Sequence, residues 1–402
     1  MLPRLIHAAP VLVLAMLVAS LAGAPLASSQ ARAAIGTRLS TITLPDGSQH
    51  TLQTATDLRV TLYASGLANA RFMALGPRND VFVGSWYAGT VSVLLDRNGG
   101  SQATKVVTLL DGLTIPHSVA YRDNMLYVGQ ADRLSRWHYD AASVSLSNGQ
   151  RVVSALPTGG RHVTRTVALG PDGSIYISVG SSCNECADAA DRAVIMHYRA
   201  DGSGGEVYAR GLRNSVGLAF QPGSGRLWAV DNGQDLLGDN IPPDELDLIR
   251  QGGDYGWPYC YGNGQPDSSV SAATGYCART ISPAASLQAH SAPLGIAFAT
   301  GSTLPARYRG GVFVAHHGSA SRSQATGYKV VYIPISGTRA GTPQDLITGW
   351  LPAGATSVGA VWGRPAGLLV AADGSLLISD DYAGVVYRLS DVGGCPCRSG
   401  CA

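Results

Sequence analysis

A histidine and two arginines occupy equivalent positions in three loops, each just before a short apolar run. His162 lies in GGRHVTRTVALGPDG, Arg213 in GLRNSVGLAF and Arg364 in VWGRPAGLLV. A histidine titrates near neutral pH and serves as a general base, and an arginine stabilises developing negative charge in a dry site. If the three loops meet at one end of a channel, they predict a catalytic site. The alternative is a hydrogen-bonded structural histidine with two arginines in salt bridges.

A loop of acids and amides follows the second of these segments, in DNGQDLLGDN from Asp231 to Asn240. Ca²⁺ binds carboxylate and backbone carbonyl oxygens in such loops, so the pattern is compatible with a hard-cation site. The alternative is a long loop whose Asp and Asn side chains form Asx turns. From these residues alone, the chemistry stays open between a hydrolase and an oxidoreductase.

The elements that must position these loops recur along the chain. Six times the sequence gives a turn, four or five apolar residues, a small-polar loop and a second short strand, from GPRNDVFVGSWYAGTVSVL to AADGSLLISDDYAGVVYRL. Asp-Gly and Gly-Ser-Gly turns suit tight hairpins, and nearly unbroken apolar strands indicate burial on both faces. The repeat starts lie roughly 45 to 85 residues apart, near the period of a four-stranded propeller blade with insertions. The sequence therefore predicts an all-β, six-bladed β-propeller with its site at the axial mouth, and a pair of β-sandwiches is the alternative.

Composition agrees with a sheet-rich protein. Charged residues make up 14% of the 402 residues, against about 25% in ordinary globular proteins, and there are 50 glycines. A formal net charge of +2 is too small to indicate a nucleic-acid partner or an anionic membrane.

The N-terminus is typical of a secretory signal peptide, predicted for residues 1–33. The apolar run APVLVLAMLVASLAGA is followed by small residues and the cleavage pattern Ala31-Arg32-Ala33, and it is shorter than the ~20 residues that span a bilayer. We therefore expect a periplasmic or secreted protein with no membrane span in the mature chain. Its propeller domain is predicted at 34–390 and a Cys-rich tail at 391–402.

Seven cysteines accompany this export signal. The spacing suggests Cys183–Cys186 and Cys260–Cys277 as local disulfides, which an oxidising compartment permits. No βαβ pattern surrounds the first pair, so a structural loop staple is favoured over a redox motif.

Five ordered phrases carry a resemblance to a known family: VGSSCNEC, GLRNSVGLAF, DNGQDLLGDNIPPDELDLI, GGDYGWPYCYG and SAPLGIAF. Together they resemble the soluble sugar dehydrogenases that depend on pyrroloquinoline quinone (PQQ), and most of all the glucose/sorbosone dehydrogenase group. The resemblance runs from about Asp57 to Leu389. It implies a six-bladed propeller, PQQ and Ca²⁺ as cofactors, and oxidation of an aldose or sorbosone-type sugar.

The resemblance also implies roles for individual residues. His162 matches the base that takes the proton of the anomeric hydroxyl, and Arg213 matches the arginine that polarises the quinone oxygen. Asn214 matches a polar contact to the cofactor. Gly233 and Gln234 align with a pair whose backbone carbonyls bind the activating Ca²⁺.

Further residues are implied to lie near the cofactor or the sugar. Arg364 matches a contact to the carboxylates of the cofactor. His117 takes the place of a glutamine near the substrate, and Ser181 takes the place of an acid near the catalytic histidine. Weaker candidates for the cofactor rim are His290, His317 and Arg322.

The leading hypothesis is therefore a PQQ- and Ca²⁺-dependent sugar dehydrogenase. Its electrons would pass to an external cytochrome or quinone, because the chain has no haem-attachment motif. One alternative is a Ca²⁺-dependent propeller hydrolase of the lactonase type, which should present acids from several blades at the axis. The other is a non-catalytic propeller that binds carbohydrate or protein.

Overall fold

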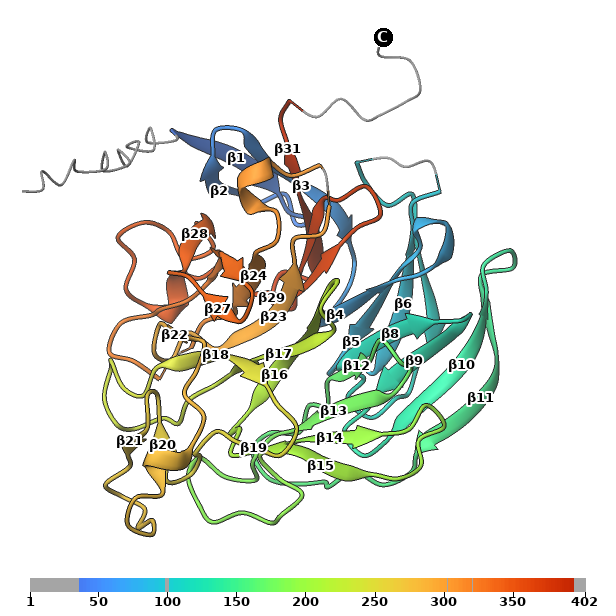
Figure 1. Cartoon of the computed structure of the whole chain (residues 1–402). Coiled ribbons are helices and arrows are strands. Elements are labelled where there is room, and N and C mark those ends of the chain that lie inside the picture. The colour runs from blue at the N-terminus through green and yellow to red at the C-terminus, as the bar shows by residue number, and fades with distance from the viewer. Residues whose placement is uncertain (1–35, 98–100, 302, 320, 394–402) are drawn as a thin grey trace, which may run out of the picture. The chain divides into compact units, whose positions relative to one another are not determined.

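The apolar runs that recur in the sequence form β-strands, grouped in six sheets of four or five strands around a common axis (Figure 1). This computed structural model describes residues 36–97, 101–301, 303–319 and 321–393. The predicted signal peptide and residues 394–402 of the predicted tail lie outside the described residues. The predicted all-β, six-bladed propeller is confirmed.

Each blade is an antiparallel meander. In blades one to five the innermost strand comes first in sequence, whereas in blade six the outermost strand does. Blade one consists of β4 (Ala70–Leu75), β5 (Val81–Ser85), β6 (Thr90–Leu95) and β7 (Lys105–Leu110). Blade two consists of β8 (Ser118–Arg122), β9 (Met125–Gly129), β10 (Leu134–Asp140) and β11 (Ser145–Val153). Blade three consists of β12 (Val167–Leu169), β13 (Ile175–Val179), β14 (Val194–Tyr198) and β15 (Glu206–Arg210), and β19 (Gly253–Asp254) pairs with β15 in parallel.

The second half of the ring follows the same plan. Blade four consists of β16 (Ser215–Gln221), β17 (Arg226–Asp231), β18 (Asp244–Ile249) and β22 (Ala285–Leu287). Blade five consists of β23 (Pro293–Phe298), β24 (Val312–His316), β25 (Lys329–Ile333) and β28 (Gln344–Ile347). Blade six consists of β29 (Pro365–Val370), β30 (Leu376–Asp380), β31 (Val385–Asp391) and β3 (Leu58–Ser65).

Short hairpins and 3₁₀ turns connect or extend the blades. Among the described residues, no helix is long and apolar enough to cross a bilayer. The remaining elements are the hairpins β1 (Thr37–Thr43) with β2 (Gln49–Ala55), β20 (Cys260–Tyr261) with β21 (Gln265–Pro266) and β26 (Ile335–Ser336) with β27 (Arg339–Ala340), and the 3₁₀ turns η1 (Pro77–Asn79), η2 (Cys277–Arg279), η3 (Ala306–Tyr308) and η4 (Val358–Ala360).

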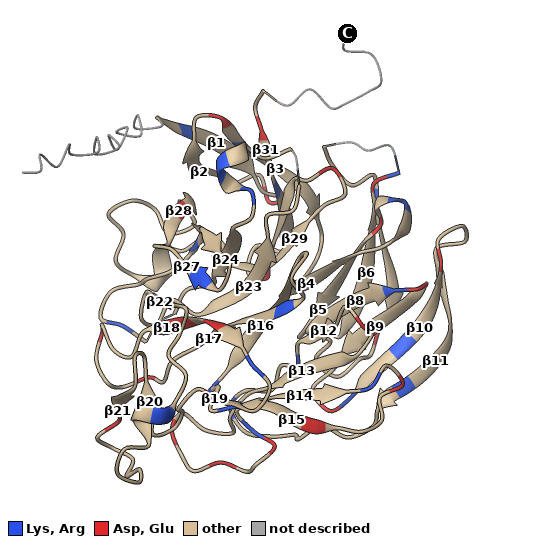
Figure 2. Ribbon diagram, in the orientation of Figure 1, with Lys and Arg blue, Asp and Glu red and all other residues tan. Residues whose placement is uncertain are grey.

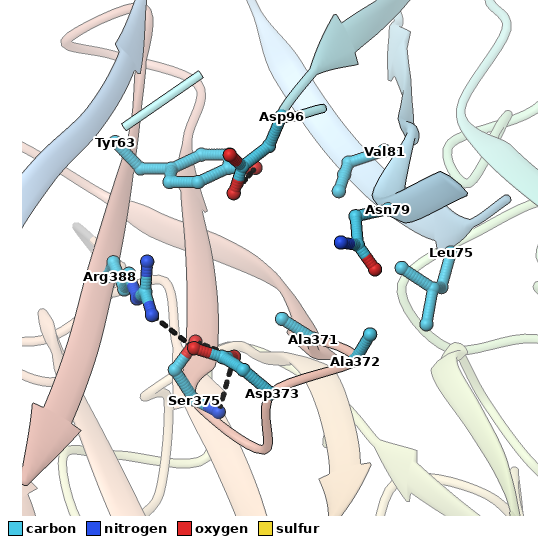
Figure 3. Close-up of a pocket in the computed structure, with 10 residues that line it drawn as sticks. All are labelled: Tyr63, Leu75, Asn79, Val81, Asp96, Ala371, Ala372, Asp373, Ser375 and Arg388. Atoms are coloured by element: carbon cyan, nitrogen blue, oxygen red, sulfur yellow. Dashed lines mark hydrogen bonds and ion pairs between the residues drawn. The ribbon is translucent and has the colours of Figure 1, made fainter. Parts of the chain in front are cut away.

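The ring closes between the two ends of the described chain. Strand β3 completes blade six by pairing antiparallel with β31, from Leu58 opposite Asp391 to Ser65 opposite Val385. A small pocket lies at the seam between blades six and one, where Tyr63 of β3 faces Asp96 and Arg388 forms an ion pair with Asp373 (Figure 3).

Glycines on the innermost strands let neighbouring blades approach closely. A Cβ on Gly217 would lie 2.3 Å from the Leu294 carbonyl oxygen, and one on Gly295 would lie 2.4 Å from that of Ala366. These strands contact one another in sequence order around the axis, and β29 returns to β4. The phrases VGLAF and LGIAF therefore encode the tight packing at the axis.

The predicted Asp-Gly hairpins use one local device in blades three and six. The Oδ1 atom of Asp172 accepts hydrogen bonds from the amide and hydroxyl of Ser174, and Asp373 does the same for Ser375. The intervening glycine, Gly173 in blade three, has φ of +88°, which favours glycine. Basic and acidic residues are interspersed around the ring (Figure 2).

Candidate active site

The loops that enter the innermost strands share one face of the ring, because every such strand runs in the same direction relative to the axis. His162 lies in the loop before β12, Arg213 in the loop before β16, and Arg364 immediately before β29. The ends of the second strands open on the same face, since each is antiparallel to its neighbour. The three predicted residues thus belong to one mouth of the propeller, from blades three, four and six.

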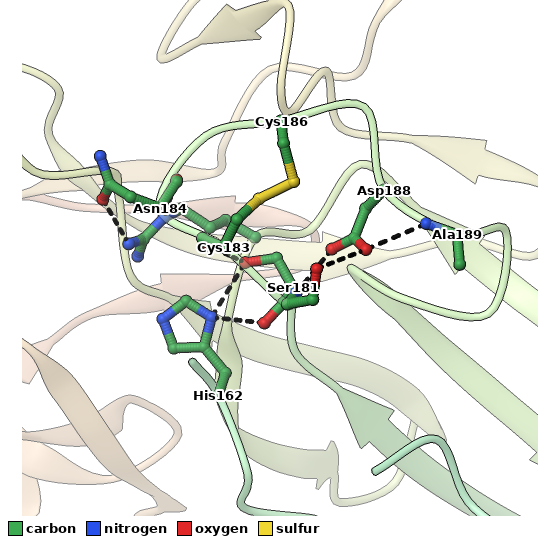
Figure 4. Close-up of a disulfide and its surroundings, with 9 residues drawn as sticks. His162, Ser181, Cys183, Asn184, Cys186, Asp188 and Ala189 are labelled. Atoms are coloured by element: carbon green, nitrogen blue, oxygen red, sulfur yellow. Dashed lines mark hydrogen bonds between the residues drawn. A yellow bond between two sulfur atoms is a disulfide. The ribbon is translucent and has the colours of Figure 1, made fainter. Parts of the chain in front are cut away.

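His162 is held through one ring nitrogen. Its Nδ1 atom lies 2.9 Å from both the carbonyl oxygen and the hydroxyl of Ser181 (Figure 4). Because that hydroxyl donates its own hydrogen to the Cys183 carbonyl at 2.7 Å, both Ser181 oxygens are acceptors and Nδ1 must carry the proton. Nε2 is therefore the free basic nitrogen. Burial, and then the positive charge of Arg213, lower the pKa of His162 to about 3.

Arg213 is 3% exposed and is clamped by main-chain and side-chain carbonyls. Its Nε donates to the Asn184 carbonyl at 2.9 Å and its Nη2 donates to Asn184 Oδ1 at 2.8 Å. Its Nη1 donates to the carbonyls of Asn232 and Gly233 at 3.0 and 2.9 Å. The Asp235 carboxylate lies 3.9 Å from Nη2. The guanidinium is thus fixed in place and keeps its charge.

Gly180 brings His162 and Asn214 together. A Cβ at this position would lie 2.6 Å from the Cβ of His162 and 2.7 Å from Oδ1 of Asn214. The two predicted residues therefore flank a single backbone position after β13, and Gly180 is needed because no side chain fits between them.

Two buried aspartates in equivalent positions anchor the arginine loops. Asp231, at the end of β17, accepts hydrogen bonds from the amides of Arg213 and Asn214 at 3.1 and 2.9 Å. Asp380, at the end of β30, accepts one from the amide of Arg364 at 2.9 Å. Burial raises the pKa of each aspartate to about 6. Asp231, which the sequence left open as a turn former or cation ligand, is thus a support for the Arg213 loop.

A second group, the Arg364 cluster, consists of Arg71, Trp86, His317, Arg364 and Asp381. Arg364 Nε donates to the His317 carbonyl at 3.2 Å, and the His317 ring lies 2.8 Å from Asp381. Asp381 also pairs with Arg71 at 3.0 Å, and the Arg71 guanidinium lies 4.0 Å from the centre of the Trp86 ring. Burial alone would raise the pKa of Asp381, but His317 and Arg71 lower it to about 2. This cluster therefore keeps its carboxylate ionised.

The weaker rim candidates lie on the same face. Nε2 of His290 is 2.8 Å from the Gly238 carbonyl, and its Nδ1 is 3.9 Å from Asp235. Arg322 donates to Asn240 Oδ1 at 3.1 Å. Both residues thus contact the loop between β17 and β18.

Two predicted residues lie deeper. His117 is fully buried, with Nε2 3.2 Å from Thr166 Oγ1, so it lies beneath the mouth surface. The Gln234 side chain is buried and donates to Asp267, whereas the neighbouring Gly233 carbonyl accepts from Arg213. Both predicted disulfides, Cys183–Cys186 and Cys260–Cys277, are confirmed.

Several residues of the mouth were not found from the sequence. Arg71 had only a partial signal, because it is the second residue of the innermost strand β4, whereas Arg213 and Arg364 precede their strands. Asp381 had a weaker one, as the second acid after a repeated strand. Asn184 gave none, since its role depends on a loop that folds back from blade three toward blade four.

Comparison with known proteins agrees with this architecture. The sequence model of the TrAA12-like family matches residues 52–392, and the chain belongs to this family. An uncharacterised protein of Borreliella burgdorferi is 30% identical over 324 residues, covering 77% of this chain and 83% of its own. The pyrroloquinoline quinone-dependent pyranose dehydrogenase of Coprinopsis cinerea is 25% identical over 415 residues, covering 86% of this chain and 55% of the enzyme.

The chain thus spans about half the length of the Coprinopsis enzyme. Among solved structures, a calcium structure of the Trichoderma reesei family AA12 enzyme superposes with a TM-score of 0.74 at 23% identity, covering 84% of this chain and 96% of that one. At this identity the likeness establishes the fold. The family membership confirms the resemblance to PQQ-dependent sugar dehydrogenases that the motifs predicted.

Proposed function

We propose that this protein oxidises a pyranose or another aldose-type sugar with PQQ and Ca²⁺, using His162 as the base. The observation that carries the proposal is the pairing of a neutral histidine, whose Nε2 is free, with the clamped guanidinium of Arg213. A hydroxyl proton needs the first and developing negative charge needs the second. The names of the family's relatives support a sugar as the substrate class.

The mouth suits a planar quinone that bears carboxylates. Arg71 Nη1 and Trp86 Nε1 are buried donors that have no hydrogen-bond partner within the described ranges. Arg364 lies in the same cluster as Arg71, and planar guanidinium groups bind carboxylates in pairs of hydrogen bonds. An anionic cofactor would satisfy these donors, which otherwise carry the cost of burial without a partner.

The loop after β17 suits a hard cation. Carbonyl oxygens are ordinary Ca²⁺ ligands, and Gly233 and Gln234 offer two in succession. The Gly233 carbonyl already accepts one hydrogen bond from Arg213, and its second lone pair remains available. The negative charges of Asp235 and the buried Asp244 would offset the repulsion between a bound cation and Arg213. Asp244 lies close to the proposed ligands, because it accepts a hydrogen bond from the Gly233 amide at 2.9 Å.

The chain's own residues then have distinct tasks. His162 Nε2 accepts the proton of the sugar hydroxyl while Ser181 keeps Nδ1 protonated. Arg213 holds a fixed positive charge toward the mouth, and Asn214 offers an amide beside it. Bound PQQ supplies the two-electron acceptor for the hydride, and bound Ca²⁺ supplies Lewis acidity. We further propose export to the periplasm or medium and transfer of the electrons to an external acceptor.

The acids of the mouth support this function over a lactonase-type hydrolase. The Asp244 carboxylate accepts from the amides of Gly233, Ser291 and Ala292. The carboxylates of Asp231 and Asp380 likewise accept hydrogen bonds from several amide and hydroxyl groups. Carboxylates engaged in this way are supports for loops and make a poor ligand set for an axial metal.

The test is a titration of the metal-free protein with PQQ, with and without Ca²⁺, followed by dye reduction across a panel of pyranoses and aldoses. We expect saturable, Ca²⁺-dependent binding, and turnover that falls at least ~100-fold in both His162→Ala and Arg213→Ala. His138→Ala, at an exposed histidine on β10, is the matched control. Absence of PQQ binding at micromolar concentrations would refute the proposal.

A further inference from the structure

We propose that Asn184, held by the Cys183–Cys186 disulfide, is a positioning residue for Arg213, so that reducing this disulfide switches the active site off. The inference rests on the proposed function for its catalytic consequence. Its structural part, the coupling of the disulfide to Arg213, stands on contacts that involve neither cofactor nor substrate.

Asn184 uses its polar groups to join two loops of the mouth. Its carbonyl and its Oδ1 accept from Arg213 Nε and Nη2 at 2.9 and 2.8 Å. The same Oδ1 accepts from the Asp235 amide at 2.9 Å, and its Nδ2 donates to the Asp235 carbonyl at 3.0 Å. Two of the four hydrogen bonds made by the Arg213 guanidinium therefore depend on this one residue.

The disulfide brackets Asn184, because the residue lies between the two bonded cysteines. The two ends of the loop are also joined, since the amide and hydroxyl of Ser182 donate to Asp188 at 2.6 and 2.8 Å. No helix or strand includes these residues, so the cross-link is the main covalent restraint on where Asn184 points. A cross-link of this kind limits the conformations that the loop explores.

The same loop contacts the proposed base. The Ser181 hydroxyl donates to the Cys183 carbonyl while accepting from His162, so one short segment holds both His162 and Arg213. If the loop loosens, a guanidinium that is 3% exposed loses two partners in a site where unpartnered charge is costly, and it moves toward water.

The switch is ordinary thiol–disulfide exchange. An external dithiol gives two electrons and two protons to the Cys183–Cys186 bond, leaving two thiols, and is itself oxidised to its disulfide. Cys183 and Cys186 are each half-buried, so a small reductant reaches them, whereas Cys260 of the other disulfide is 4% exposed. Oxidation in an exported environment restores the site.

The first experiment compares Asn184→Ala with Asn184→Asp in the full chain. The aspartate keeps a side-chain acceptor for Arg213 Nη2 and for the Asp235 amide, whereas the alanine keeps only the backbone carbonyl that accepts from Arg213 Nε. We expect kcat to fall about 10- to 100-fold in Asn184→Ala with little change in KM, and Asn184→Asp to recover most of it. A merely structural role would lower the unfolding temperature of both variants without this difference in kcat.

A second readout needs no cofactor. In the cofactor-free protein, the ring nitrogens of His162 are followed by NMR against pH, with His162→Gln for assignment. The charge of Arg213 helps to keep the pKa of His162 low, together with burial, so release of Arg213 raises that pKa. We expect a higher midpoint in Asn184→Ala and in protein reduced by dithiothreitol. Asn184→Asp is kept for the kinetic comparison alone, because its added carboxylate beside Arg213 would itself raise the midpoint.

The matched control is the double variant Cys260→Ala/Cys277→Ala, which removes the other disulfide. It should leave the His162 midpoint unchanged, and Cys183→Ala/Cys186→Ala should move it as reduction does, with alkylation and mass spectrometry locating the reduced thiols. An unchanged His162 midpoint in Asn184→Ala and in the reduced protein would overturn the inference. A shifted midpoint in a protein that does not turn over would instead keep the coupling and reject the dehydrogenase.

Discussion

His162 depends on two oxygens of a serine to select its tautomer. Both oxygens of Ser181 accept, so Nδ1 donates and Nε2 is the ring nitrogen that carries no proton. A serine lends no negative charge to the ring, and the nearby Arg213 opposes protonation. In the role that we propose for it, His162 is therefore a weak proton acceptor whose neutral form is available over a wide pH range.

The first prediction concerns this pH range. The pKa of His162 lies at about 3, so its neutral form persists as the pH falls from 8 to 5, whereas an unperturbed histidine would be only roughly 3% neutral at pH 5. We expect kcat/KM at saturating PQQ and Ca²⁺ to keep more than about half its neutral value at pH 5. A kinetic limb with a midpoint near 6.5 in the pH profile of kcat/KM would contradict this.

The second prediction concerns the buried support of Arg213. In Asp231→Asn, an amide NH₂ replaces one acceptor oxygen and meets the amides of Arg213 or Asn214 as a second donor. We expect unfolding to require about 1–3 kcal/mol less free energy, measured by urea titration. Asp380→Asn, its equivalent in blade six, should cost a similar amount, but only Asp231→Asn should shift the NMR midpoint of His162.

At the scale of the elements, the inner strands depend on glycine where two backbones meet. The third prediction is that Gly295→Ala destabilises the fold by about 1–3 kcal/mol, because its Cβ would lie 2.4 Å from the Ala366 carbonyl oxygen. Gly359→Ala serves as the control, since its Cβ would meet nothing closer than 3.5 Å. Equal unfolding free energies for the two variants would exclude close blade packing as the reason for the glycine.

The strands and turns were predictable because their signals are local. The conformation of an Asp-Gly-Ser turn or of an apolar run of five residues is determined by contacts within the segment itself, such as the hydrogen bonds from Ser174 to Asp172. The contacts between loops were less predictable from the sequence. The phase of Arg213 placed it at the mouth, but its partner Asn184 is 29 residues away in sequence and comes from another blade. Such a contact exists only after blades three and four have packed together, so no spacing in the sequence encodes it.

At the scale of the whole molecule, six blades and one closing strand define a single ring. The fold class could be predicted because the same hairpin pattern recurs six times. The exact partner of β3 could not, because its pairing with β31 joins residues more than 300 positions apart, such as Leu58 and Asp391. Periodicity reveals that a blade exists, but closure is a property of the complete circle.

The fourth prediction tests this closure. Removing residues 1–65 deletes β3 and leaves β31 as an open edge in blade six. We expect the cooperative unfolding transition, followed by circular dichroism, to be lost or lowered by more than about 10 °C, and the protein to associate through the exposed edge. Removing residues 394–402 retains every described strand, and its transition should match that of the full chain.

The pairing of β3 with β31 also sets the order of events as the polypeptide is made. Leu58–Ser65 is synthesised early and has to wait, without its sheet partner, until Val385–Asp391 has emerged. Contacts separated by this much sequence form slowly, so blades one to five have time to assemble before the circle is completed. Closure of the ring therefore depends on β3 and β31 finding each other across the sequence of all the other blades.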